Sequence, residues 1–172
     1  MNSELLRRVG DWHNRARDEK EEDYFVKFIF DYLAFIALIC HDNDNKSDRN
    51  LIQELKQNNE EMRNNYYSKV NIDRINEIIG ILKSDPITND TNRHDKWWDC
   101  DLEHCTNQVS SNDGIINSVD DFPNILEFIY RARNNLFHGK KGIDFRRDSL
   151  IVEYGFYLLN PLVDVLIESE GS

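Results

Sequence analysis

The residues best suited to chemistry lie close together, in the sequence RARNNLFHGKK of residues 131–141. A histidine can exchange a proton near neutral pH, and an arginine can bind phosphate oxygens through two N–H groups at once. At about 100° per residue, Asn134 and His138 lie about 40° apart on a helix, with Arg131 nearby. The guanidinium of Arg133 starts about 140° from His138 and reaches that side only through its long side chain. These residue types suit phosphoryl chemistry on RNA.

Charge sets this segment apart from the remainder of the chain. The 172 residues include 21 Lys+Arg and 32 Asp+Glu, which gives a formal net charge of −11. Residues 131–147 carry six basic residues and one acid, a local charge of +5, against −16 elsewhere. An acidic protein repels nucleic acid and anionic lipid, whereas a short positively charged segment such as residues 131–147 fits a confined site for the phosphate backbone. Arg131, Lys140 and Lys141 are therefore candidate substrate-binding residues.

His138 is expected at the C-terminal end of a helix that Gly139 stops. The helix dipole favours imidazolium there, which helps a histidine to donate a proton or to hold an anionic phosphate. The same pattern is also ordinary capping, because basic residues followed by glycine stabilise the last turn of a helix. From these residues alone, a structural role and a catalytic role both stay open.

The elements that position these residues are all predicted to be helices. Apolar residues recur at three- and four-residue spacings, and no alternating pattern is long enough for a sheet. Residues 24–40 are apolar on all sides and are expected at the centre of a bundle. Asp121 is a candidate cap for the helix that carries the motif, Asp148 for the last helix, and Pro161 is expected to bend that helix. The predicted helices cover residues 3–20, 24–40, 51–62, 72–84, 121–138 and 148–166.

Length and composition indicate a single domain over residues 1–172. Residues 87–121 show no sustained period and are rich in Asn, Asp, Ser and Thr, so we expect a long irregular insertion before the motif helix. The predicted fold class is therefore an all-α bundle of about five to six helices. Three cysteines without repeated spacing favour a reducing compartment. With no apparent signal peptide or membrane segment, we expect a cytoplasmic protein without a membrane partner.

The insertion holds two weaker candidates for function. Trp97 and Trp98 could stack on bases, and the alternative is that one of them anchors the insertion to the bundle. Four residues are close enough in sequence to suggest zinc, although their spacing fits structural zinc sites poorly, so no metal is predicted. These four are His94, Cys100, His104 and Cys105.

The sequence from Arg133 to His138, RNNLFH, resembles the Arg-x4-His motif, with Asn next to the Arg, of the HEPN superfamily of helical ribonucleases. The following Gly139 and Lys140 also fit. An apolar helix ahead of the motif, a long apolar helix after it and an aromatic-rich early helix are similar to the arrangement in stand-alone HEPN proteins. The resemblance implies a HEPN-like helical bundle and a metal-independent endoribonuclease that needs no cofactor. It also implies a homodimer in which the Arg and His of two protomers face each other across a shared cleft.

Carried over residue by residue, the resemblance assigns three catalytic residues. His138 would assist proton transfer at the 2′-oxygen or the leaving oxygen, Arg133 would stabilise the charge of the phosphorane, and Asn134 would orient the phosphate or His138. RNA would be cleaved through its own 2′-hydroxyl. The cellular role implied is that of a toxin or defence effector, with an antitoxin or regulatory protein as a partner. Members regulated by a nucleotidyltransferase antitoxin carry a tyrosine where this chain has Lys140, so that mode of regulation is not expected here.

Asp31 is a candidate supporting acid, because HEPN nucleases often place an acidic residue near the motif. A carboxylate in an apolar helix is costly unless it is paired, and the alternative is a simple ion pair with Lys27, one turn earlier. A second hypothesis for the whole chain is a catalytically inactive helical dimer that binds RNA or a protein partner through the same face.

Overall fold

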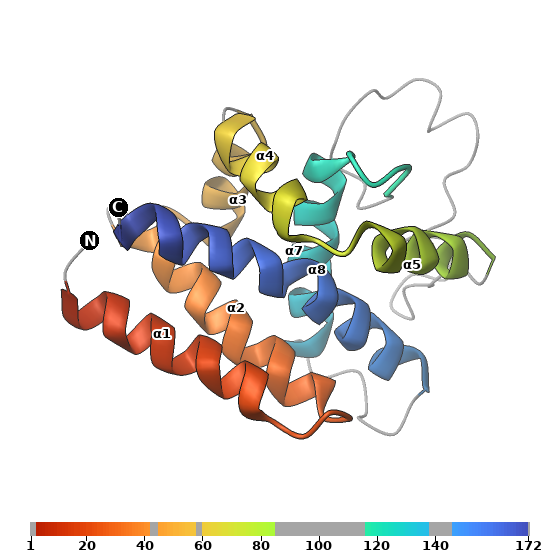
Figure 1. The fold of residues 1–172 in the computed structure, drawn as a ribbon, viewed down its shortest axis with the longest axis horizontal. Coiled ribbons are helices and arrows are strands. Elements are labelled where there is room, and N and C mark those ends of the chain that lie inside the picture. Colours follow the sequence, from red (N-terminus) through yellow and green to blue (C-terminus); the bar gives the residue numbers. More distant parts are fainter. Residues whose placement is uncertain (1–2, 42–44, 58–59, 85–115, 138–145, 172) are drawn as a thin grey trace.

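The computed structural model describes residues 3–41, 45–57, 60–84, 116–137 and 146–171, and all regular structure in these ranges is helical (Figure 1). The predicted all-α fold is confirmed. Seven helices lie in the described ranges: α1 (Ser3–Asp18), α2 (Tyr24–Cys40), α3 (Asp48–Gln57), α4 (Glu60–Lys69), α5 (Ile72–Ser84), α7 (Phe122–Phe137) and α8 (Arg146–Gly171).

Two predicted helix boundaries are wrong. The helix expected over residues 51–62 is two helices, α3 and α4, and the sequence between them is Asn58-Asn59. Asparagine competes with the helical backbone through its own side chain, so it favours helix ends. The last helix begins at Arg146, which places Asp148 in its first turn and not at the cap. That helix continues through Pro161, because one proline removes a single backbone hydrogen bond and the packing of α8 maintains the rest.

Helices α1, α2 and α8 lie side by side along the length of the molecule (Figure 1). Helix α1 runs antiparallel to α2, whereas α2 and α8 run in the same direction. The Tyr24 hydroxyl at the start of α2 lies 2.6 Å from the Tyr157 hydroxyl near the middle of α8. Gly155 permits the close approach, because a Cβ there would lie 2.7 Å from Cε2 of the buried Phe28 ring. This layer holds much of the core.

Helix α7 packs against α8 on one side and against α3 on another. The side with the core residues Ile125, Phe128, Ile129 and Ala132 is fully buried. Helix α4 also lies against α8, where the Tyr66 hydroxyl donates to the Leu158 carbonyl oxygen at 3.1 Å. Helix α7, whose second half carries the first residues of the motif, thus packs against both α8 and α3.

Helix α2 is not enclosed on all sides, contrary to expectation. Phe28, Tyr32, Phe35 and Leu38 are buried, but Leu33 is 42% exposed. The helix is covered by α1, α8 and α3, and these neighbours leave one of its faces open in the described structure. An apolar stripe on this acidic molecule therefore reaches the surface.

One described helix is long and apolar enough to cross a membrane by length and composition, namely residues Ser149–Gly171 of α8. More than half of the apolar window in that helix, 56%, is buried inside the molecule. The core helix of a water-soluble bundle has the same properties, so this is weak evidence for a membrane span.

Candidate functional site

The motif helix begins where the sequence places it. Asp121 stands at the N-cap of α7, and its backbone carbonyl oxygen accepts the first helical hydrogen bond from the Ile125 N–H at 3.0 Å. Its carboxylate accepts from the Asn117 N–H at 3.0 Å and from the Asn124 side-chain amide at 2.9 Å. Ile116 is buried, so the end of the predicted insertion is attached to the bundle. Residues 87–115 of the insertion lie outside the described residues.

Arg133 is held in the second half of α7 by three groups. Its Nη1 donates to the Asn134 Oδ1 at 2.9 Å, so the guanidinium turns toward the side on which the sequence placed Asn134. Its Cζ lies over the Tyr32 ring, 5.7 Å from the ring centroid. The Asp48 carboxylate of α3 is 3.7 Å from Nη2. Because its side chain is only partly exposed, Arg133 is a partly desolvated cation in a fixed orientation.

The last residue of the motif and the lysines that follow it lie outside the described residues. This applies to His138, Lys140 and Lys141, and equally to Trp97 and Trp98 of the insertion. The four zinc candidates, His94, Cys100, His104 and Cys105, also lie outside them. Within the part of the chain that the structure describes, no group of three or more His, Cys, Asp or Glu side chains is placed to hold a metal ion.

Arg131 contacts a carboxylate that the sequence reasoning did not single out. Its Nε donates to the Glu127 Oε1 at 3.0 Å, one turn earlier on α7. Arg49 and Lys56 of α3 each donate to the other oxygen, Oε2, at 2.6 Å. Burial raises the pKa of Glu127, but the hydrogen bond and charge of Lys56, with Arg131 and Arg49, outweigh it, so this pKa is lowered. Glu127 is therefore a buried, ionised carboxylate among three cations.

Helix α3 covers the face of α7 that carries Glu127 and Arg131, and Glu127 is buried there. The sequence holds a signal for the Glu127–Arg131 pair, because Glu127 is an acid among apolar residues and Arg131 follows it four residues later. Arg49 and Lys56 carry no such local signal, since they lie more than 70 residues away in the chain.

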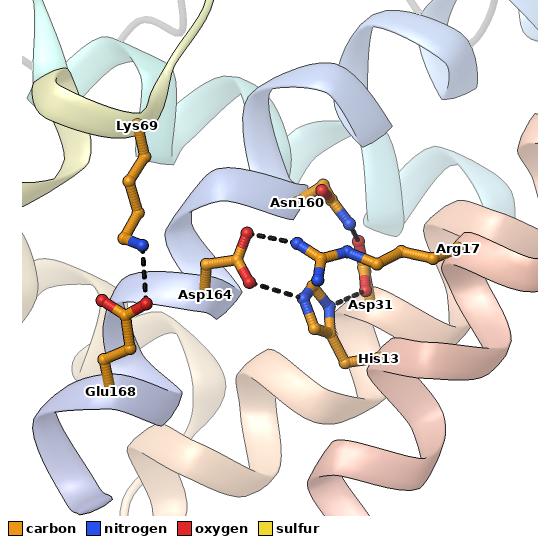
Figure 2. A network of polar contacts seen from close by, with 7 residues as sticks. All are labelled: His13, Arg17, Asp31, Lys69, Asn160, Asp164 and Glu168. Carbon is orange, nitrogen blue, oxygen red and sulfur yellow. Dashed lines mark hydrogen bonds and ion pairs between the residues drawn. The ribbon is translucent and has the colours of Figure 1, made fainter.

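Asp31 belongs to a different network, drawn in Figure 2. Its Oδ1 is 2.7 Å from His13 Nδ1, and its Oδ2 accepts from the Asn160 side-chain amide at 2.8 Å. The other ring nitrogen of His13 is 3.1 Å from Asp164, which Arg17 also contacts. Burial raises the pKa of Asp31, opposed by the hydrogen bonds from His13 and Asn160.

The alternative of a simple Lys27–Asp31 pair is therefore wrong. Lys27 Nζ instead lies 5.5 Å from the centroids of the Tyr24 and Phe156 rings. The neighbouring helices bring polar groups directly onto the buried carboxylate, so Asp31 does not depend on the lysine one turn away. The network joins α1, α2 and α8, and it includes His13, which no sequence motif marks as a candidate.

The structure does not bring Asp31 and Arg133 together. Asp31 contacts groups of α1 and α8, whereas Arg133 contacts groups of α7, α2 and α3. Among the predicted site residues that are described, Arg133 and Asn134 are in direct contact, and Arg131 bonds to the Glu127 cluster.

A scan against protein-family models found no matching family, and searches of curated proteins and of solved structures found no match.

Proposed function

We propose that the chain is a metal-independent endoribonuclease of the HEPN type, with a site built around Arg133, Asn134 and His138. The observation that carries the proposal is the orientation of Arg133. Its guanidinium is turned onto Asn134 and packs against the Tyr32 ring, and the residue lies four positions before the end of α7, within the last two turns. A guanidinium fixed in this way loses little freedom when it binds a phosphate.

In the proposed mechanism the RNA supplies the nucleophile. The 2′-hydroxyl loses its proton and attacks the adjacent phosphorus, the bond to the 5′-oxygen breaks, and the products are a 2′,3′-cyclic phosphate and a free 5′-hydroxyl. His138 moves a proton at the 2′-oxygen or at the leaving oxygen, Arg133 stabilises the negative charge of the phosphorane, and Asn134 orients the phosphate or His138. Arg131, Lys140 and Lys141 bind the RNA backbone.

The proposed assembly is a homodimer with two Arg/His pairs in one cleft. The open face of α2 supports it, because Leu33 is exposed there and Val26 and Ile29 are only partly buried. The Arg133 guanidinium lies over the ring of Tyr32, the residue next to Leu33, so an interface on this face would lie close to the site. A two-fold axis places the same apolar patch on both protomers.

The proposed setting is the cytoplasm, where the protein acts as a toxin or defence effector under the control of an antitoxin or regulatory protein. The net charge of −11 supports a confined RNA site, since repulsion over the remaining surface opposes unspecific adhesion. Neither a cofactor nor a metal ion takes part in the proposed reaction.

The test is cleavage of mixed RNA by the purified protein in EDTA. We expect the native protein to cut RNA, and Arg133→Ala and His138→Ala to lose the activity while circular dichroism shows an unchanged helix content. Arg7→Ala is a matched control, because Arg7 is exposed on α1 and pairs with Asp11, one turn later on the same helix. Cleavage by Arg133→Ala at the native rate would contradict the proposal.

A second candidate function is a catalytically inactive dimer that binds RNA or a protein through the same face. The approach of Asp48 to Arg133 favours it, because a carboxylate beside the guanidinium competes with a phosphate. Absence of cleavage by the native protein, together with retained RNA binding, would favour this candidate.

A further inference from the structure

We propose that Arg49 of α3, together with Arg131 of α7, forms an additional binding point for an RNA phosphate beside the motif. The inference rests on the proposed function for its ligand, and it adds a residue from a helix that the motif does not include. The starting observation is that three cationic side chains converge on one carboxylate.

The geometry of this cluster is compact. Arg49 Nη1 and Lys56 Nζ both lie 2.6 Å from Glu127 Oε2, and Arg131 Nε lies 3.0 Å from Oε1. Three positive charges and one negative charge leave these four residues with a net positive charge. On a chain of net charge −11, a concentration of positive charge held together despite its own repulsion indicates an anion site.

The buried part of the cluster consists of Lys56 and Glu127, whose opposite charges cancel without Arg49. The Lys56 and Glu127 side chains are each 2% exposed, so this pair satisfies the need to balance a buried carboxylate. The Arg49 and Arg131 side chains are 37% and 35% exposed, respectively. Their charges reach solvent, and the shared carboxylate holds them near each other. Arg49 therefore carries a charge that the buried pair does not require and that a ligand can reach.

The orientation of Arg49 suits a phosphate ligand. Its guanidinium lies over the Tyr130 ring, 5.1 Å from the centroid, and one nitrogen is used on Glu127. A guanidinium has five N–H donors, which match the paired oxygens of a phosphate. The aromatic ring and the carboxylate fix the plane of the group before any ligand binds.

The placement of the cluster connects it to the motif. Glu127, Arg131 and Asn134 follow one another at four- and three-residue spacings and so share one face of α7. Asp48, the neighbour of Arg49 in α3, is the residue that approaches Arg133. Glu127 itself is buried under α3, but Arg49 and Arg131 beside it are partly exposed, so an RNA strand that extends from Asn134 toward α3 would contact this pair. Because the Arg49–Arg131 pair lies beside the proposed RNA site, its ligand is a phosphate of the same RNA strand.

The experiment measures binding of a fluorescent single-stranded RNA to the full chain carrying His138→Ala, which prevents cleavage in the proposed mechanism. Arg49→Ala in this background should weaken binding roughly tenfold, the loss expected for one charged hydrogen-bonding group. The slope of log affinity against log salt should fall by about 0.7, the value for one phosphate contact on a single strand. Arg49→Lys keeps the positive charge but loses the paired N–H donors of the guanidinium. Its RNA affinity should therefore lie between those of the parent and the Arg49→Ala protein.

The matched control is Lys46→Ala, which removes an exposed cation just before α3 that is paired with Glu54 at 2.8 Å. The Lys46→Ala protein should bind RNA with the affinity of its parent and with the same dependence of affinity on salt concentration. Equal binding by the Arg49→Ala and parent proteins, an equal loss in Lys46→Ala, or no RNA binding by the parent would each overturn the proposal. If Arg49→Ala weakens binding but the protein with His138 intact does not cut RNA, the nuclease proposal fails while the Arg49 site stands.

Discussion

At the scale of single residues, two buried carboxylates are balanced in different ways. Asp31 has no exposed surface and is bonded by neighbouring helices, with the His13 imidazole at 2.7 Å. Glu127 is balanced by three cations and has a lowered pKa. Because the free energy of a buried carboxylate depends on its partners, each can be tested by a substitution in its network.

His13→Ala should lower the free energy of unfolding by about 3 kcal/mol, because it leaves the Asp31 carboxylate buried without the imidazole. Arg17→Ala is the control in the same network, since its side chain is exposed and its pair with Asp164 should contribute at most about 1 kcal/mol. Urea denaturation measures both. Equal losses in the two variants would show that His13 has no special role.

Glu127→Gln should be less stable than the native protein, by an amount that depends on pH. The folded-state pKa of Glu127 is lowered, so its contribution to stability is fully present above the unfolded pKa of about 4.3 and is lost as pH falls through the folded pKa. The stability difference between native and variant proteins should therefore shrink below about pH 4.3. Urea denaturation at several pH values measures it, and a difference independent of pH would contradict the assignment.

At the scale of elements, the contact between α2 and α8 sets how closely the central helices pack. Gly155 lies where a Cβ would be 2.7 Å from the Phe28 ring, and that ring is fully buried. Gly80 of α5 has no atom within 4 Å of a Cβ built on it. The two glycines thus differ in packing while both lie within helices.

Gly155→Ala should lower the free energy of unfolding by about 1–3 kcal/mol through overpacking. Gly80→Ala should raise it by about 0.5–1 kcal/mol, because alanine has the higher helix propensity and meets no obstacle. Thermal or urea denaturation distinguishes the signs. A stabilised Gly155→Ala protein would mean that α2 and α8 do not approach as described.

The elements also show what sequence can predict. The cap at Asp121 and the apolar side of α7 were predictable, because they depend on residues within a few turns of one another. The partners of Asp31 were not, since His13 and Asn160 come from other helices and the local candidate, Lys27, lies against aromatic rings. Arg49 was missed for the same reason: its role depends on Glu127, which lies far away in the chain.

At the scale of the whole molecule, an acidic surface carries one open apolar face on α2. If that face is the proposed dimer interface, light scattering should give about twice the chain mass of 20.4 kDa. Leu33→Asp should then yield a monomer, because two buried carboxylates would face each other at the interface. Ile72→Asp is the matched control, as Ile72 is an exposed apolar residue at the start of α5. A native monomer at micromolar concentration would contradict the dimer.

The most direct test of the central proposal replaces a single 2′-hydroxyl. An RNA whose cleavage position has been mapped is made again with 2′-deoxyribose on the 5′ side of that bond, and the cleavage rates of the two RNAs are compared. The proposed mechanism predicts no cleavage at the deoxy position and a cyclic phosphate on the product of the all-ribose RNA. Cleavage of the deoxy position at the rate of the original RNA would contradict it.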